Sequence, residues 1–252
     1  MKSGEAFKKG TQVMHPYADP TVIMWWVRHP HSVAIQDDTY YGDGCDITKR
    51  GKKQLMRLGR EIERLRPDLI LCSPALRSVR VVQESDIHLC DRLRREPAVG
   101  EWPRATCMLG KPNSSEEVMA YLESRIKRFG PGQEVLPGEE SFEQTCELMG
   151  DISEKLVLQG APIRAKHKRP ARIIIQSHGN RGRQFFAWAL ANGDPELFRG
   201  LFHLFYNKIG IDPTGIMPPL WYGRFFRGGD LGWNSDWGSV RHLPQNLRDS
   251  AI

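Results

Sequence analysis

Two histidines and two arginines of this sequence have the chemistry needed to transfer a phosphoryl group: Arg28, His29, Arg77 and His178. A planar guanidinium group binds phosphoryl oxygens through paired N–H donors. A neutral imidazole can attack phosphorus and form a phosphohistidine, which divides one difficult displacement into two easier steps. Neighbouring arginine charge would lower the pKa of His29 and keep its ring neutral. The second histidine could stabilise charge on the transferred group.

Each of these residues follows a short apolar segment that is typical of a strand buried on both faces. The segments are residues 22–27, 69–72 and 172–176. Predicted helices at about 48–65, 73–84 and 178–191 alternate with them, which favours an α/β fold, a three-layer α/β/α sandwich with a mainly parallel central sheet. Because ligand sites of such sheets lie outside the carboxyl ends of the strands, we expect the four side chains to meet at one edge.

The remaining segments suggest a single domain over residues 21–252, preceded by an N-terminal extension at 1–20. Two insertions, at about 86–138 and 194–236, are expected to form an irregular cap. The other expected elements are a short strand near 87–89, a helix from Ser114 or Ser115 to Phe129, a helix at 141–158, a solvated basic loop at 164–169, one or two helices after 194, and strands near 223–227 and 237–243.

The composition is that of a globular protein, with 40% hydrophobic and 26% charged residues among 252, and it excludes a disordered or fibrous chain. The net charge of +6 is mild, and no zinc-finger spacing, RNA-binding sheet signature or basic heptad is present, so we expect no nucleic-acid partner. No signal peptide or membrane-spanning segment is apparent. Five scattered cysteines without a CxxC pair suggest a reducing compartment, and we expect a cytoplasmic protein with no membrane partner.

Five short motifs in order resemble those of the histidine phosphatase (phosphoglycerate mutase-like) superfamily, over roughly residues 22–190. They are Val27-Arg28-His29-Pro30, Ile47-Thr48-Lys49-Arg50-Gly51, Ser73-Pro74-Ala75-Leu76-Arg77, Glu139-Glu140-Ser141 after Pro137-Gly138, and Ser177-His178-Gly179. Each motif alone is weakly specific, whereas five in the family's order are strongly specific. The resemblance implies a phosphoglycerate mutase-like fold.

The resemblance also implies roles for single residues. His29 is the expected nucleophile, and Arg28, Arg77 and His178 are the expected phosphate-binding residues. Glu96 is the expected proton donor, because the family's donor is often a glutamate four residues before a glycine that an acidic residue and a tryptophan follow. Glu101 and Glu140 are the fallback donors. No metal and no organic cofactor are implied.

Three positions depart from the family's pattern: Pro30 replaces a glycine, His31 an acidic residue, and Ile35 an asparagine. These changes argue against a true phosphoglycerate mutase, whose opening motif is more closely kept. We therefore expect a metal-independent, histidine acid phosphatase-like enzyme that hydrolyses a phosphate monoester of a small molecule through a phosphohistidine intermediate.

Several alternatives stay open at this point. The chain could be a mutase-type phosphotransferase, or a catalytically impaired relative that binds a phosphorylated ligand or a partner. The His29-Pro30-His31 unit, followed by aspartates, could instead belong to a metal-dependent hydrolase. Glu96 could be a surface carboxylate among neighbouring arginines. The aromatic tail could be core or a lid, and the apolar segment 201–206 could be the face of a homodimer.

Overall fold

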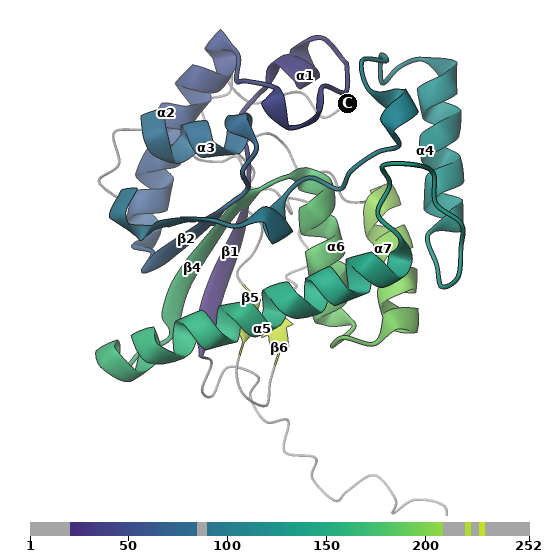
Figure 1. Cartoon of the computed structure of the whole chain (residues 1–252). Helices are drawn as coiled ribbons and strands as arrows, with labels where there is room; N and C mark the ends of the chain where they lie inside the picture. Colours follow the sequence, from purple (N-terminus) through teal and green to yellow (C-terminus); the bar gives the residue numbers. More distant parts are fainter. Residues whose placement is uncertain (1–20, 85–89, 209–219, 223–226, 230–252) are drawn as a thin grey trace, which may run out of the picture.

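A mixed sheet of six strands forms the centre of the computed structural model, which describes residues 21–84, 90–208, 220–222 and 227–229 (Figure 1). The strand order is β3-β2-β4-β1-β5-β6. The strands are β1 (Val22–Arg28), β2 (Leu69–Cys72), β3 (Leu93–Arg95), β4 (Ala171–Ser177), β5 (Leu220–Tyr222) and β6 (Arg227–Gly229). The first four in this order are parallel, and β5 and β6 each run antiparallel to the preceding neighbour.

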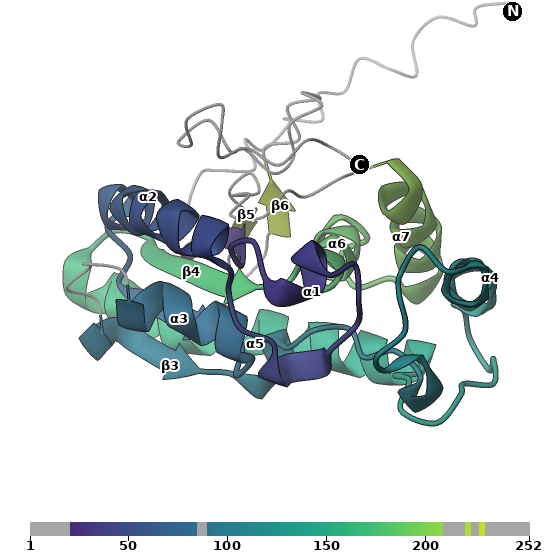
Figure 2. The same ribbon diagram turned by 90° about the horizontal axis from the view of Figure 1, so that it is seen from above.

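Helices cover both faces of the sheet, because side chains along its strands alternate between two separate cores. Val27, Ile70 and Ile174 pack with α2 and α3 on one face, whereas Trp26, Leu71 and Ile175 pack with α5 and α6 on the other. Figure 2 shows α2 and α5 on opposite sides of the sheet. The helices are α1 (Val33–Gln36), α2 (Lys49–Leu65), α3 (Leu76–Glu84), α4 (Glu116–Arg128), α5 (Phe142–His167), α6 (Gly179–Leu190) and α7 (Pro195–Lys208). The predicted three-layer sandwich is therefore confirmed.

Aromatic rings join the segment between β3 and α5 to the core on the α5 face. The Phe129 ring, at the end of α4, lies 4.7 Å from that of Phe202 on α7 and 5.1 Å from that of Phe142 on α5. Trp102 packs edge-on against Phe129 and Phe202 at 5.5 Å. Burial of such rings contributes strongly to stability, so this cluster fixes α4 and the loop around Trp102 to the main body.

The prediction of a solvated loop at 164–169 was wrong for most of its length, because α5 continues to His167. Pro162 lies within this helix, where the missing N–H removes only one hydrogen bond of a long ladder. The basic residues occupy the last turn, where the negative end of the helix dipole favours them. Lys168 ends the helix in the left-handed conformation, with φ of 52°.

Other boundaries differ from the predicted ones. α3 begins at Leu76 rather than at Ser73, and β3 was not predicted. The expected strand at 87–89, the extension 1–20 and the strand at 237–243 lie outside the described residues. Of the strand expected near 223–227, residues 223–226 lie outside the described residues, and Arg227 is the first residue of β6. Among the helices that the structure describes, none is both long and apolar enough to cross a membrane.

The contact between α5 and the sheet gives a stability prediction. A Cβ atom on Gly160 would lie 2.2 Å from Cγ2 of the buried Val22 side chain, so Gly160→Ala should destabilise the protein by about 1–3 kcal/mol through overpacking. Gly150 lies on the same helix, and a Cβ atom there would meet nothing within 4 Å. Gly150→Ala should stabilise the helix by up to about 1 kcal/mol. Urea unfolding of both variants checks this, and equal midpoints would contradict it.

Candidate active site

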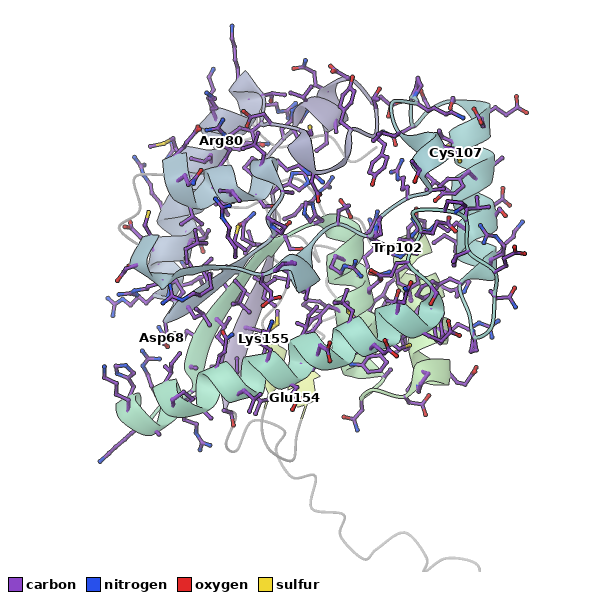
Figure 3. The ribbon with its side chains drawn as sticks, viewed as in Figure 1. Asp68, Arg80, Trp102, Cys107, Glu154 and Lys155 are labelled. Atoms are coloured by element: carbon purple, nitrogen blue, oxygen red, sulfur yellow. The ribbon has the colours of Figure 1, made fainter. Side chains whose placement is uncertain are left out.

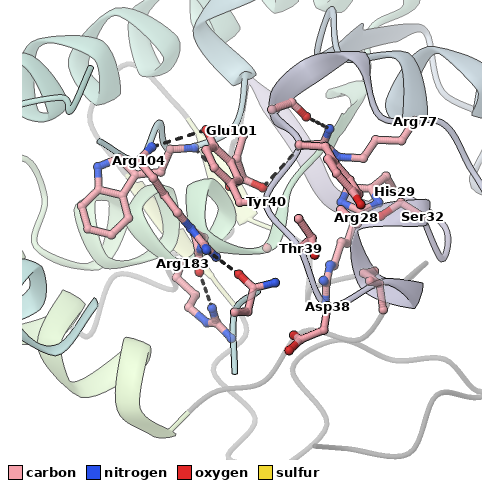
Figure 4. A pocket seen from close by; sticks show the side chains of 18 residues that line it. Arg28, His29, Ser32, Asp38, Thr39, Tyr40, Arg77, Glu101, Arg104 and Arg183 are labelled. Carbon is pink, nitrogen blue, oxygen red and sulfur yellow. Dashed lines mark hydrogen bonds and ion pairs between the residues drawn. The ribbon is translucent and has the colours of Figure 1, made fainter. Parts of the chain in front are cut away.

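Backbone hydrogen bonds of the sheet continue one residue past the ends of β1 and β2. They fix where the loops that follow these strands begin. The His29 N–H donates to the Ser177 carbonyl over 3.0 Å, and the Ser73 N–H donates to the Gln176 carbonyl over 2.9 Å. β1, β2 and β4 therefore end at the same level of the sheet. The structure brings Arg28, His29, Arg77 and His178 together at one sheet edge, as predicted. Figure 4 labels the first three.

His29 is buried, and its tautomer is fixed by its neighbour. Nδ1 lies 2.7 Å from the carbonyl oxygen of Pro30, which can only accept, so Nδ1 carries the proton and Nε2 holds the lone pair. This contact uses the carbonyl of residue 30 and not its N–H. Proline in place of glycine is therefore compatible with a nucleophilic Nε2.

His178 is held between Arg77 and Ser73 at the centre of the site. Arg77 Nη2 lies 3.3 Å from His178 Nδ1, and the other nitrogen, Nε2, lies 2.8 Å from Ser73 Oγ. Because a guanidinium group only donates, Nδ1 is the acceptor and Nε2 carries the proton. Arg77 is itself buried and donates through Nη1 to the Gly42 carbonyl. The rings of His29 and His178 lie 5.2 Å apart.

The surroundings keep both histidines neutral. The pKa of His29 falls well below its ordinary value of 6.5, first because the ring is buried and then because of the charges of Arg77, His178 and Arg28. The pKa of His178 is lowered in the same way, by burial and then by Arg77, Arg181 and Arg28. A buried neutral imidazole beside two guanidinium groups has the properties of a nucleophile that attacks an anionic centre.

Arg28, His29 and Arg77 line a pocket of about 280 Å³, and the fully buried His178 lies behind this lining (Figure 4). Glu101 and Ile35 also line the pocket. Arg104 and Arg183 line it on the other side from Arg28 and Arg77 in Figure 4. Four guanidinium groups around one cavity make it a site for an anion.

The structure does not bring Glu96 together with the other predicted site residues. Its Oε1 accepts a hydrogen bond from the Ala98 N–H, and its Oε2 pairs with Lys155 on α5, which Figure 3 labels. Glu96 is buried and does not line the pocket. The fallback residue Glu101 does: its Oε2 lies 3.3 Å from His178 Nδ1 and 3.8 Å from Arg77 Nη2.

A buried ion pair holds the backbone of Glu101. Arg181 on α6 donates to the carbonyls of Gly100, at 3.0 Å, and of Glu101, at 3.3 Å. Two further bonds of 2.7 and 2.8 Å join its guanidinium group to Glu140. Burial raises the pKa of Glu140, but the bonds from Arg181 outweigh this and the pKa is lowered. Glu140, the second fallback donor, is therefore paired with Arg181.

His31 belongs to the scaffold of the site and is not paired with His29. Its Nδ1 lies 2.9 Å from Thr48 Oγ1 at the start of α2, and its N–H donates to Gln54. A Cβ atom on Gly51 would lie 2.1 Å from the His31 carbonyl oxygen, so α2 can approach this loop only with glycine there. The motif around Thr48 and Gly51 thus fixes the loop that follows the nucleophile.

Among the described residues, one group has the spacing of a metal site: His29, Glu101 and His178, whose ligand atoms lie within 4.8 Å of one another. The charges of Arg28 and Arg77 that lower the pKa of both histidines would also repel a divalent cation. The electrostatics of the group therefore favour a phosphoryl oxygen over a metal ion.

The sequence reasoning missed Arg104 and Arg183 as pocket residues. Arg183 lies four residues after Gly179, which is about one turn of α6, so helical spacing after the Ser-His-Gly motif contained a signal for it. Arg104 follows Trp102 in an irregular segment, and no local pattern places it near His29.

Comparison with known proteins assigns the family. A model of the histidine phosphatase superfamily (branch 1) matches residues 24–210, which is more than half of the chain. The chain belongs to this superfamily. The resemblance inferred from the five motifs is thereby confirmed. The sequence has no significant match among curated proteins.

Solved structures of several phosphatases share the fold at low identity. A phosphoserine phosphatase mutant from Entamoeba histolytica, in complex with phosphoserine, is 16% identical with a TM-score of 0.62, and the match covers 88% of this chain and 100% of that one. The mycobacterial glucosyl-3-phosphoglycerate phosphatase with inorganic phosphate is 14% identical with a TM-score of 0.62 and the same coverage. A putative alpha-ribazole-5'-P phosphatase from Escherichia coli is 16% identical with a TM-score of 0.60, and the match covers 86% of this chain and 96% of that one.

The electrostatics predict how the two histidines titrate. In the ligand-free protein, the NMR titration midpoints of the His29 and His178 rings should lie below 6.5, because burial and arginine charge disfavour the protonated form. Arg77→Gln should raise both midpoints and leave them below 6.5, because burial is the larger cause. His29→Asn and His178→Asn assign the signals. A His29 midpoint at or above 6.5 in the unmodified protein would contradict the description of this site.

Proposed function

We propose that the protein hydrolyses phosphate monoesters through a phosphohistidine formed on His29. The observation that carries this proposal is the neutral, buried His29 ring, with a free lone pair on Nε2, beside Arg28 and Arg77 in an anion-binding pocket. Membership of the histidine phosphatase superfamily supports it, as do the phosphatase names of the structural neighbours.

In the first step, His29 Nε2 attacks phosphorus while the bond from phosphorus to the leaving oxygen breaks. Arg28 and Arg77 offset the charge on the phosphoryl oxygens, and His178 completes the phosphate pocket. Glu101 is the carboxyl group in the pocket beside His178, and we assign it the transfer of a proton to the leaving oxygen. The products of this step are a free alcohol and phospho-His29.

In the second step, water attacks the same phosphorus and the bond to Nε2 breaks. The Glu101 carboxylate, which lost its proton in the first step, accepts one from the attacking water. Inorganic phosphate leaves, and the neutral His29 ring is restored. The two steps together consume one ester and one water and need no metal or organic cofactor.

The test is a search for the covalent intermediate with ³²P-labelled p-nitrophenyl phosphate in the presence of EDTA. Samples of the unmodified protein quenched in alkaline detergent should carry label that alkali retains and later acid treatment releases, and His29→Ala should carry none. Inorganic phosphate should accumulate in water without an added acceptor alcohol, as hydrolysis requires.

The other outcomes separate the rival functions. Label that leaves the protein only when an acceptor alcohol is added would indicate a phosphotransferase. Tight binding of phosphate without label or turnover would indicate an impaired relative. Turnover that EDTA abolishes would indicate a metal-dependent hydrolase. Each of these results would overturn the proposed reaction.

The choice between the two carboxylates gives a matched pair of variants. Glu101→Gln should lower kcat on an alkyl phosphate by about 10²–10⁴-fold, because the alkoxide then leaves without a proton. On p-nitrophenyl phosphate the first step, measured as the burst of nitrophenolate in the first turnover, should slow much less, because nitrophenolate leaves readily as an anion. Glu96→Gln should keep kcat on both substrates, because Glu96 pairs with Lys155 outside the pocket. A larger loss in Glu96→Gln, with thermal unfolding unchanged, would contradict this assignment.

A further inference from the structure

The pocket has a second cationic wall, formed by Arg104 and Arg183, which the reaction at His29 does not use (Figure 4). We propose that this wall binds a second anionic group of the substrate, so that the preferred substrate is a phosphate monoester whose leaving group carries a carboxylate or another phosphate. This inference rests on the proposed function, because it concerns the leaving-group side of the same pocket.

Neutral groups hold Arg104 in place. Its Nη1 donates to Oδ1 of Asn113 over 2.5 Å, and its guanidinium carbon lies 5.0 Å from the centre of the Tyr40 ring. An amide oxygen and an aromatic face orient a guanidinium group without cancelling its charge. Both partners also line the pocket, so the orientation of Arg104 is built into the wall.

Arg183 lies on α6 and also interacts electrostatically with the Glu101 carboxylate. Its Nη1 donates to Oδ1 of Asn180 over 2.6 Å, and its guanidinium carbon lies 5.6 Å from the centre of the Tyr206 ring. Burial lowers the pKa of Arg183, yet a guanidinium group stays protonated throughout the physiological range. A partly dehydrated cation interacts with an anion more strongly than an exposed one does.

The charges around the pocket exceed what one phosphate group needs. Four arginines and two carboxylates line it, and with neutral His29 their formal sum is 4 − 2 = +2. When Glu101 holds the proton that it transfers, the sum is +3. In the proposed reaction Arg28 and Arg77 bind the transferred phosphoryl group. With Glu101 protonated, a positive charge therefore remains on Arg104 and Arg183 even after the exposed Asp38 carboxylate is counted.

The two cationic groups come from different parts of the chain. Arg28 is the last residue of β1 and Arg77 lies in the first turn of α3. Arg104 belongs to the segment between β3 and α4, and Arg183 belongs to α6. A substrate with two anionic ends would bridge these parts. A substrate with a neutral leaving group would contact only the first pair, which is how the second wall distinguishes substrates.

Three phosphate esters of equal chain length test the proposal: n-propyl phosphate, 3-(phosphonooxy)propanoate and propane-1,3-diyl bisphosphate. The protein should hydrolyse the two with an anionic tail with kcat/KM about 10–100-fold above that of n-propyl phosphate, as one or two charge-assisted hydrogen bonds allow. The better of the two identifies the second group as a carboxylate or as a phosphate.

Arg104→Gln and Arg183→Gln should each reduce this preference ratio toward one. Arg94→Gln is the matched control, because Arg94 is an exposed arginine on β3 outside the pocket, and it should keep the ratio of the unmodified protein. Equal kcat/KM for the three esters, or an unchanged ratio in both pocket variants, would overturn the proposal.

Binding separates this proposal from that of the reaction. Isothermal titration of His29→Ala with the same three esters needs no turnover, and the esters with an anionic tail should bind about 10–100-fold more tightly. Adding Arg104→Gln to this variant should remove the difference. If no ester is hydrolysed but this order of affinities is observed, the proposed reaction is contradicted and the second anion site is supported. Equal affinities would remove the second anion site.

Discussion

The parallel pairing of β4 with both β1 and β2 is the constraint on which the site depends. In this register Arg28 lies opposite Ser177, and Cys72 lies opposite Gln176, so the three strands end at the same level. A slip of one residue would turn the side chains that follow a strand to the opposite face. The two separate cores on the faces of the sheet prevent such a slip, because it would exchange their contents. Packing far from His29 thus fixes the geometry around it.

The ion pair between Arg181 and Glu140 fixes the position of Glu101 in the site. The Arg181 and Glu140 side chains are 3% and 13% exposed, and loss of one member of such a pair costs about 3–5 kcal/mol because the other is left buried and charged. A buried pair is often no more stabilising than apolar residues of equal volume. Its bonds to the carbonyls of Gly100 and Glu101 give a different reason for it, since they place Glu101 beside His178.

The sequence was sufficient for the central strands and for the four residues at their ends, because short apolar runs followed by Arg-His, Ser-Pro and Ser-His-Gly are local signals. β3 was missed because an edge strand of Leu93-Arg94-Arg95 has a single apolar residue. The end of α5 was misplaced because Pro162 and a basic run are typical of a loop. The family's pattern favours Glu96 as the proton donor over Glu101, which lies five residues later. Only the position of Lys155 on α5 shows that Glu96 is already paired.

The same burial that makes His29 a nucleophile also makes the site a source of instability in acid. Both histidines have a pKa in the folded protein that is lower than the ordinary value of 6.5, which the unfolded chain keeps. Below pH 6.5 the unfolded chain therefore binds protons that the folded protein does not, and each histidine removes up to about 1.4 kcal/mol of stability per pH unit. Above that pH the two states bind equally few protons, and this loss disappears. A bound phosphoryl group opposes the loss, because its negative charge raises the pKa of both rings toward that of the unfolded chain. A phosphorylated ligand thus offsets the loss of stability that the cationic pocket causes in acid.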